Sequence, residues 1–433
     1  MTEPRGPATA RIPRFEPGEE HALGLDRQWE PRSCRDRFHI PVTAAGTPVI
    51  YFCGHSLGLQ PKSASAGVAQ ELDDWRKLAV HAHFHGRTPW YSYHEVFRET
   101  GARLVGGRAG EVVMMNSLTT NLHLMMASFY RPKHERHKIL IEDNAFPSDA
   151  YAVQSQAAHH GYDPEQTAIV ARPRAGEATL RTEDLEALID ERGREIAVVL
   201  LSGVNYFTGQ AFAMERITEH AHRQGCVVGF DLAHAAGNLV LELHDWEIDF
   251  AVWCSYKYLN AGPGAVAGCF VHERHGNDPR TPRLAGWWGN DPDTRFQMHL
   301  AATFQPRLGA DGWQLSNPPI LALAPLRASL EIFDAAGIKA LRARSEILTG
   351  YMEFLLHQVA GERFEILTPR ATEERGCQLS IRVRRAAPDL VQALEHAGVV
   401  CDFRKPDVLR VAPVPLYNTC HEIWRFTEIL RAH

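Results

Sequence analysis

Residues 226–262, CVVGFDLAHAAGNLVLELHDWEIDFAVWCSYKYLNAG, contain two short apolar runs that each end in polar side chains. The first run, 226–230, ends at Asp231, and the second, 250–254, is followed closely by Lys257. Short apolar runs with such boundaries predict buried strands. Because open α/β sheets bind ligands at the carboxyl ends of their strands, we expect Asp231 and Lys257 to meet at one edge of a sheet.

A carboxylate and an amine at such an edge indicate a site for pyridoxal phosphate (PLP). In PLP enzymes a lysine forms a Schiff base with the cofactor, and an acid pairs with the pyridinium nitrogen. Lys257 and Asp231 suit these two tasks, and His234 and Tyr256 lie beside them in the sequence. Alone, the lysine could be a solvated surface charge and the acid a helix cap. Their occurrence together favours the cofactor.

Other predicted strands also end in polar residues. From residue 138 onward, strands alternate with helices, which predicts parallel βαβ units in a sheet covered on both faces. Phe146-Pro147-Ser148-Asp149 follow the strand at 139–142, and Ser202 follows the strand at 197–201. Residues 116–121 begin a helix and are either a plain N-cap or an anion-binding helix start. Polar groups at four strand ends are the pattern of a site.

The chain is long enough for two domains. Its 433 residues are 45% hydrophobic and 23% charged, as expected for a globular protein. We predict an N-terminal segment (1–60) that contributes to the small domain, a large cofactor-binding domain (61–320) and a small α+β domain (321–433). Residues 1–45 are expected to be irregular, with Trp29 and Phe38 as anchors. A long helical region from residue 320 to about residue 360, broken near Gly337, is expected to join the domains.

The overall composition excludes several classes of partner and location. A net charge of −6 gives no reason to expect nucleic acid or an anionic membrane. No run approaches the roughly 18 apolar residues of a membrane span, and the N-terminus lacks the apolar core of a secretory signal. The 8 cysteines form no C-x-x-C pair, which indicates a reducing compartment, and we expect a cytoplasmic protein. His81, His83 and His85 lack partners at ligand spacing, so no metal is predicted.

Seven short motifs in this order resemble kynureninases. They are FPSD (146–149), SGVNYFTGQ (202–210), DLAHAAGN (231–238), SYKYLNAGPG (255–264), AGWWG (285–289), SNPP (316–319) and LRVAPVPLYN (409–418). The resemblance implies a homodimeric PLP enzyme of the aspartate aminotransferase fold (fold type I), with a mostly parallel sheet in the large domain. It also implies hydrolytic cleavage of 3-hydroxykynurenine or kynurenine between the β and γ carbons, giving alanine and 3-hydroxyanthranilate or anthranilate.

The resemblance also implies roles for individual residues. The cofactor cradle falls on Leu118, Thr119, Phe146, Pro147, Ser148, Asp149, Ser202, Asp231, His234, Tyr256 and Lys257. Trp287 and Asn317 match positions that reach the cofactor phosphate across the dimer interface. Arg410 would hold the substrate α-carboxylate. His83, Ser316 and Asn317 match relatives that prefer the 3-hydroxylated substrate, so we expect that preference here.

We assign Tyr256 a second role, as the acid/base that assists hydration or protonates the β-carbon. The loop at Asn290 departs from relatives that carry histidine there.

Two other functions share part of this pattern. A cysteine desulfurase or selenocysteine lyase would keep the acid, histidine and lysine, but it also needs a cysteine in a mobile loop near the site. Cys254 and Cys269 lie in strand-like runs and Cys377 begins one, so no such cysteine is evident. A non-catalytic protein of the same fold could dispense with Lys257 or Arg410, and both are present.

Overall fold

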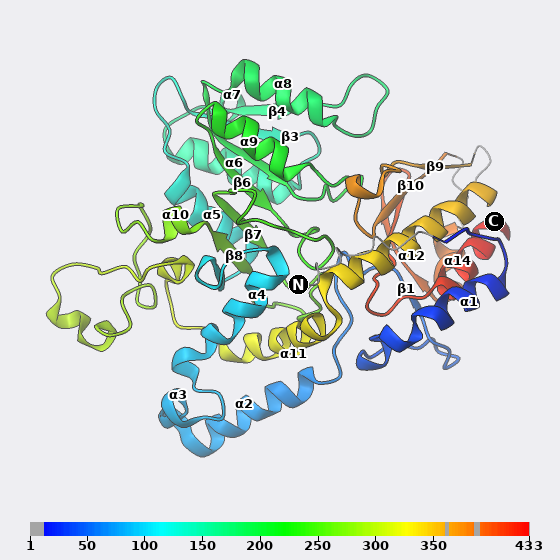
Figure 1. Ribbon diagram of the computed structural model, residues 1–433, viewed down its shortest axis with the longest axis horizontal. Helices are drawn as coiled ribbons and strands as arrows, with labels where there is room; N and C mark the ends of the chain where they lie inside the picture. The colour runs from blue at the N-terminus through cyan, green and yellow to red at the C-terminus, as the bar shows by residue number, and fades with distance from the viewer. Residues whose placement is uncertain (1–12, 360–362, 385–389, 433) are drawn as a thin grey trace, which may run out of the picture.

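The computed structural model describes residues 13–359, 363–384 and 390–432, and its strands form two principal sheets in different parts of the molecule (Figure 1). The larger sheet has seven strands in the order β2-β8-β7-β6-β5-β3-β4. Strands β7, β6, β5, β3 and β4 run parallel, while β8 is antiparallel to both of its neighbours. The predicted α/β fold with a mostly parallel sheet is confirmed. The strands are β2 (Val112–Met114), β3 (Lys138–Glu142), β4 (Ala168–Ala171), β5 (Ile196–Ser202), β6 (Val227–Asp231), β7 (Phe250–Trp253) and β8 (Gly268–Val271).

Helices cover both faces of this sheet because its strands are apolar on both sides. In β5, Val198 and Leu200 pack into one buried cluster, and Val199 and Leu201 pack into another on the opposite face. This alternation follows from the two-residue period of a strand. Helices α5 and α6 supply side chains to the first cluster, and α4, α8, α9 and α11 supply the second. The helices of this part are α2 (Ala64–Leu78), α3 (Ala82–His85), α4 (Arg98–Val105), α5 (Leu118–Phe129), α6 (Pro147–His159), α7 (Pro164–Thr167), α8 (Thr182–Arg192), α9 (Met214–Arg223), α10 (Glu273–Gly276) and α11 (Ile320–Ala336).

The smaller sheet is antiparallel, in the order β12-β13-β10-β9, and packs against long helices. Its apolar face meets α12, α14 and α1 in a third buried cluster. A separate parallel pair, β1 with β11, joins the N-terminal part to this region. The elements are α1 (Glu19–Trp29), β1 (Ile50–Tyr51), α12 (Ile338–Val359), β9 (Phe364–Ile366), β10 (Leu379–Val383), α13 (Leu390–His396), β11 (Val399–Val400), β12 (Asp402–Arg404), β13 (Val408–Val411) and α14 (Cys420–Ala432). The domain boundaries at positions 60 and 320 stay predictions.

Helices α11 and α12 connect the two sheets (Figure 1). Gly337, at φ +76°, separates them, and a residue with a Cβ is strained in that conformation. The predicted break near Gly337 is therefore confirmed.

One expectation about local structure was wrong. Residues 1–45 are not irregular throughout, because α1 buries Ala22 and Leu25 against the third cluster. Further along the chain, a 3₁₀ helix carries the buried Tyr93 and Phe97 and continues directly as α4. Aromatic side chains lose rotamer freedom in an α-helix, which favours another backbone form here. The 3₁₀ helices are Glu30–Arg32, Arg35–Arg37, Ala79–His81, Trp90–Phe97, Ala109–Glu111, Arg295–Leu300, Ala310–Trp313 and Thr372–Glu374.

The two residues expected to anchor the N-terminal segment differ in burial. Phe38 is buried in the core of the large sheet, whereas Trp29 is partly exposed at the end of α1. No helix within the described ranges has the length and apolar character needed to cross a membrane.

Asp26 of α1 fixes the N-terminal helix to the small sheet region. Its carboxylate accepts hydrogen bonds from the backbone N–H groups of Cys420 (2.8 Å) and His421 (2.9 Å), at the start of α14. It also pairs with the buried guanidinium of Arg344 at 2.6 Å. A helix start offers unpaired N–H groups and a partial positive charge, so a carboxylate is stabilising there.

We expect Asp26→Asn to lower the free energy of unfolding by about 3 kcal/mol, because it leaves a buried guanidinium without its counter-ion. Chemical denaturation measures this change. Glu20→Gln, on the exposed side of the same helix (88% side-chain exposure), is the matched control and should change stability by less than about 0.5 kcal/mol. Equal effects of the two variants would contradict the assigned role of Asp26.

Candidate active site

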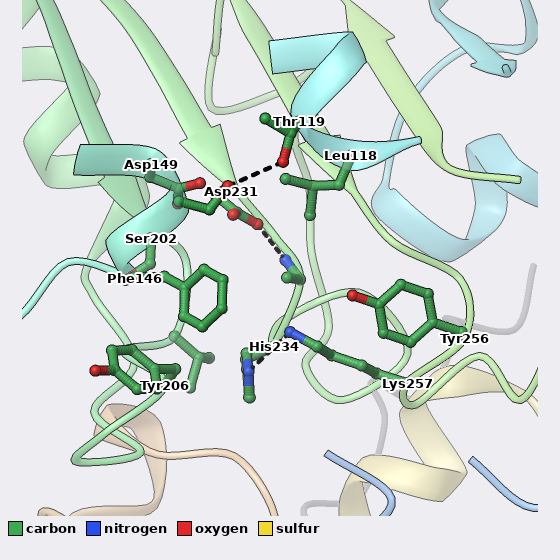
Figure 2. Close-up of a pocket in the computed structure, with 13 residues that line it drawn as sticks. Leu118, Thr119, Phe146, Asp149, Ser202, Tyr206, Asp231, His234, Tyr256 and Lys257 are labelled. Carbon is green, nitrogen blue, oxygen red and sulfur yellow. Dashed lines mark hydrogen bonds between the residues drawn. The ribbon is translucent and has the colours of Figure 1, made fainter. Parts of the chain in front are cut away.

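A pocket lies at the carboxyl ends of four neighbouring strands, β7, β6, β5 and β3 (Figure 2). Its empty volume, which includes space open to solvent, is about 490 Å³. The parallel register places Ser202 of β5 beside Asp231 of β6. Asp231 and Lys257 therefore meet at one edge of the sheet, as the sequence predicts. It is lined by Leu118, Thr119, Phe146, Ser148, Asp149, Ser202, Val204, Tyr206, Asp231, Ala233, His234, Tyr256 and Lys257.

Asp231 is buried beside other carboxyl groups. Its Oδ1 accepts a hydrogen bond from the N–H of Ala233 at 2.7 Å. Asp149, at the first turn of α6, faces it, and burial together with the charge of Asp231 raises the pKa of Asp149 well above its ordinary value. Burial also raises the pKa of Glu142, which accepts the hydroxyl of Ser202 at 2.5 Å. Crowding of acids makes this end of the pocket attractive to a cationic group.

Lys257 and His234 approach each other from two strand ends (Figure 2). The Nζ of Lys257 lies 3.1 Å from Nε2 of His234. Burial, and then the charge of Lys257, lower the pKa of His234 well below its ordinary value, so its imidazole is neutral. A neutral imidazole accepts the lysine N–H through Nε2 and keeps its own proton on Nδ1. That Nδ1 is buried and has no hydrogen-bond partner among the described residues.

Aromatic rings form the walls of the pocket. The Nζ of Lys257 lies 5.6 Å from the ring centre of Phe146 and 6.0 Å from that of Tyr256. Burial raises the pKa of the Tyr256 phenol, and the neighbouring Cys254 contributes in the same direction. Tyr206 meets Phe146 edge to face at 5.2 Å. The sequence reasoning did not single out Tyr206, although it stands inside the SGVNYFTGQ motif.

The start of α5 supplies the remaining wall. Leu118 and Thr119 are its first residues, and the hydroxyl of Thr119 lies 3.0 Å from that of Ser148. Backbone N–H groups at a helix start can bind a phosphate. Pro147 does not line the pocket; it begins α6, where a missing N–H has no consequence.

Arg410 lies directly behind Tyr206. Its Nη1 donates to the Tyr206 carbonyl at 2.7 Å, and its Nη2 pairs with Asp402. The side chain is fully buried, and burial lowers the pKa of Arg410 to about 10. The small sheet thus places a guanidinium against Tyr206, which lines the pocket, although Arg410 itself is not a lining residue.

Four predicted residues lie away from this pocket within the single chain. His83 packs against the edge of Trp90 at 5.4 Å, and Trp287 packs against Trp288 at 5.3 Å while 43% exposed. Ser316 and Asn317 are exposed.

The pocket residues fit PLP. Buried polar atoms without partners among the described residues, His234 Nδ1 and Asp149 Oδ1, face a cavity that also offers an amine, an acid and a flat aromatic ring. These are the groups that the cofactor requires: a Schiff-base lysine, a partner for the ring nitrogen and a stacking surface.

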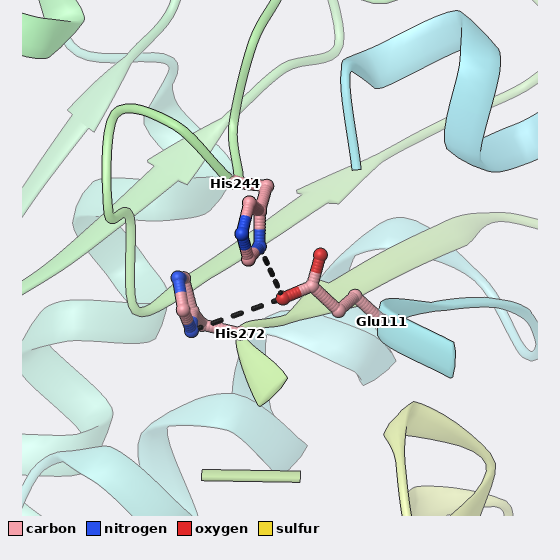
Figure 3. A group of neighbouring side chains, drawn as sticks. All are labelled: Glu111, His244 and His272. Atoms are coloured by element: carbon pink, nitrogen blue, oxygen red, sulfur yellow. Dashed lines mark hydrogen bonds and ion pairs between the residues drawn. The ribbon is translucent and has the colours of Figure 1, made fainter. Parts of the chain in front are cut away.

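A second cluster consists of residue types that can bind a metal ion: Glu111, His244 and His272. Their candidate ligand atoms all lie within 4.8 Å of one another (Figure 3). Its atoms already have protein partners. Glu111 Oε1 lies 2.9 Å from Nδ1 of His244 and accepts the N–H of Glu273 at 2.7 Å. Nδ1 of His272 accepts the N–H of Arg274 at 3.2 Å. The cluster therefore ties chain segments together at the sheet end opposite the pocket.

Comparison with known proteins identifies the family. Residues 341–430 match the family model described as "Kynureninase C-terminal domain". A kynureninase of Koribacter versatilis is 56% identical, covering 96% of this chain and 97% of the relative. A kynureninase of Myxococcus xanthus is 56% identical, covering 97% and 98%. A kynureninase of Flavobacterium psychrophilum is 51% identical, covering 95% and 97%.

Solved structures show the same fold at low identity. The cystine C–S lyase C-DES, in complex with cysteine persulfide, aligns with a TM-score of 0.73 at 19% identity, covering 88% of this chain and 97% of that chain. The apo cysteine desulfurase of Thermococcus onnurineus aligns with a TM-score of 0.70 at 17% identity, covering 89% and 94%. The fold is that of PLP-dependent fold-type I enzymes, and the chain belongs to the kynureninase family.

Proposed function

We propose that this chain is a PLP-dependent kynureninase, a hydrolase that cleaves the Cβ–Cγ bond of 3-hydroxykynurenine and kynurenine. The products are L-alanine and 3-hydroxyanthranilate or anthranilate. The observation that carries the proposal is the convergence of Lys257, Asp231 and Phe146 at adjacent strand ends, in a chain 56% identical to kynureninases over 96% of its length. A place in tryptophan and kynurenine catabolism, which also feeds NAD biosynthesis, goes with this activity.

Lys257 holds the cofactor and then moves the proton at the substrate α-carbon. When bound, PLP supplies an electron sink that stabilises a carbanion at the substrate. The neutral His234 supports Lys257, because it accepts an N–H from the amine without adding a positive charge beside it. Phe146 lies where it can stack on the ring.

Asp231 pairs with the ring nitrogen and keeps it protonated. The raised pKa of Asp149 supports this role, because a protonated neighbour can donate to Asp231 rather than repel it. Thr119 and Ser148, with the first N–H groups of α5, would bind the phosphate, and Leu118 and Ser202, which also line the pocket, would complete the cradle.

Tyr256 is the proposed acid for hydration of the γ-carbonyl or protonation of the β-carbon. A tyrosine phenol is protonated at neutral pH and so has a proton to donate, and burial of Tyr256 favours that protonated form further. Its ring centre lies 6.0 Å from the Nζ of Lys257, the group that would hold the cofactor.

A homodimer with the site at the subunit interface is proposed from the exposed apolar surface. The segment between α10 and α11, yellow-green in Figure 1, extends away from the large sheet. Both this segment and helix α2 carry large apolar side chains that are exposed. They are Leu284, Trp287, Phe296, Leu300 and Leu308 on the segment, and Leu72 and Trp75 on α2. Such surface is typical of a subunit interface. In a dimer, the exposed Trp287 and Asn317 would reach the phosphate of the partner site.

His83, Ser316 and Asn317 are proposed to contact the aryl ring and its hydroxyl, with Arg410 on the α-carboxylate. Arginine suits that task because its guanidinium binds carboxylates in a bidentate manner. The hydrogen bond from Arg410 to the Tyr206 carbonyl holds the guanidinium next to a residue that lines the pocket. A cytoplasmic location is proposed because all eight cysteines are unpaired.

The cysteine desulfurase alternative is less favoured. Six of the eight cysteines are buried, and none lines the pocket. Burial raises the pKa of Cys254, the cysteine nearest in sequence to Lys257, and also that of the half-buried Cys53. A cysteine nucleophile needs a lowered pKa and access to the substrate.

The principal test is product analysis of the purified protein with PLP. We expect a yellow protein that borohydride bleaches, and alanine with 3-hydroxyanthranilate by mass spectrometry. Lys257→Ala should reduce turnover by about 10³-fold or more, whereas Lys339→Ala, 73% exposed on α12, should not change it. Sulfide or selenide release in place of aryl product would contradict the proposal.

Tyr256→Phe should reduce kcat by about 10²- to 10⁴-fold with a smaller change in KM, because the variant loses a proton donor that acts during the reaction. Tyr151→Phe, on α6 and 67% exposed, is the matched control. Full turnover by Tyr256→Phe would remove the assignment.

The wild-type protein should show a higher kcat/KM for 3-hydroxykynurenine than for kynurenine. Asn317→Ala should reduce that ratio by about 10-fold, because the proposed polar contact to the hydroxyl, made in the dimer, is lost. Steady-state kinetics with both substrates measures the ratio. A preference of the wild type for kynurenine would overturn the assignment of these residues.

A further inference from the structure

A buried histidine that the mechanism above does not use stands beside the pocket. His55 lies in the turn after β1 and is 1% exposed. Neither of its ring nitrogens has a hydrogen-bond partner among the described residues. Its Nε2 is 3.7 Å from Oδ2 of Asp402, and its ring centre is 6.3 Å from that of His234. A buried imidazole without partners is unfavourable, and a hydrogen-bonding ligand at this position would relieve that cost.

Positive charges surround His55. Burial lowers its pKa well below the ordinary value, and Arg410, Lys257 and Arg404 add to this effect, while the Phe52 carbonyl opposes it. The ring is therefore neutral and has one N–H donor, for which the Phe52 carbonyl is the competing acceptor within the protein. A neutral donor facing several cations is suited to an anionic ligand.

Asp402 is a single carboxylate shared between two guanidiniums. Its Oδ2 pairs with Nη2 of Arg410 and accepts from Nε of Arg404 at 2.9 Å. Arg410 is fully buried, and its Nε has no partner among the described residues. The cluster thus holds more positive than negative charge, and it has unused donors on both Arg410 and His55.

We propose that His55 is a second binding residue for the carboxylate of the amino-acid substrate. Before substrate binds, the Asp402 carboxylate occupies the position at Arg410 that the substrate carboxylate then takes. Asp402 can leave Arg410 without losing its ion pair, because Arg404 stays with it. The substrate carboxylate then takes hydrogen bonds from Arg410 and from the N–H of His55. This inference rests on the proposed function, since it presupposes an amino-acid substrate.

The test compares two amines that differ by one carboxylate, L-alanine and ethylamine. Both are titrated into the PLP-loaded enzyme, and binding is read from the change in visible absorption of the bound cofactor. His55→Leu should raise the Kd of L-alanine by about 10-fold or more and leave that of ethylamine within about twofold. His55→Gln should restore binding of L-alanine, because an amide keeps an N–H donor.

Asp402→Asn should lower the Kd of L-alanine, because a neutral amide competes weakly for Arg410. The matched control is Asp407→Asn, in the same β12–β13 hairpin, where Asp407 lies 3.5 Å from Arg382. It should leave both ligands unchanged. Melting temperatures and cofactor spectra verify that each variant is folded and loaded.

Two outcomes would overturn this inference and leave the proposed function intact. If His55→Leu weakened the binding of both amines equally, His55 would act on the cofactor or the fold. If Asp402→Asn weakened the binding of L-alanine, the role of Asp402 would be to orient Arg410. Failure of the wild-type protein to bind L-alanine would instead overturn the proposed function on which the inference rests.

Discussion

The parallel pairing of β6 with β5 and β7 is the constraint on which the site depends. It places Asp231 beside Ser202 on one side and beside Val252 on the other. Helices cover both faces of these strands, so the acid at the end of β6 is held away from water. A carboxylate in such surroundings interacts strongly with any neighbouring charge.

This burial has a chemical consequence at the pocket. Asp149 and Glu142 lie near Asp231, and burial raises the pKa of both. Buried carboxyl groups close together cannot all ionise, so the site favours either shared protons or a cationic partner. The protonated pyridine ring of PLP is such a partner. At the other end, the Nζ of Lys257 lies 3.1 Å from Nε2 of His234, whose imidazole is neutral.

The small sheet makes a different contribution. Through β12 and β13 it holds Asp402 and Arg410 in register, and Arg410 reaches the large sheet through the carbonyl of Tyr206. The capped start of α14 and the helix α1 hold this region together through Asp26. Recognition of the substrate carboxylate is thus proposed to depend on contacts between segments far apart in the sequence. The residues proposed to bind the cofactor, in contrast, lie mostly at the ends of neighbouring strands of one sheet.

The sequence alone determined the alternation of strands and helices, the strand ends that carry polar groups, and the family motifs. These are local properties: apolar runs, turn residues and short motifs can be read without knowing what packs against them. Tertiary structure decided that α1 is a helix, because Asp26 and Leu25 are stabilised by residues near 344 and 420. It also decided the place of Tyr206, the shared pairing of Asp402 and the burial of His55. Each of these depends on contacts between distant parts of the chain, which no local pattern of side chains specifies.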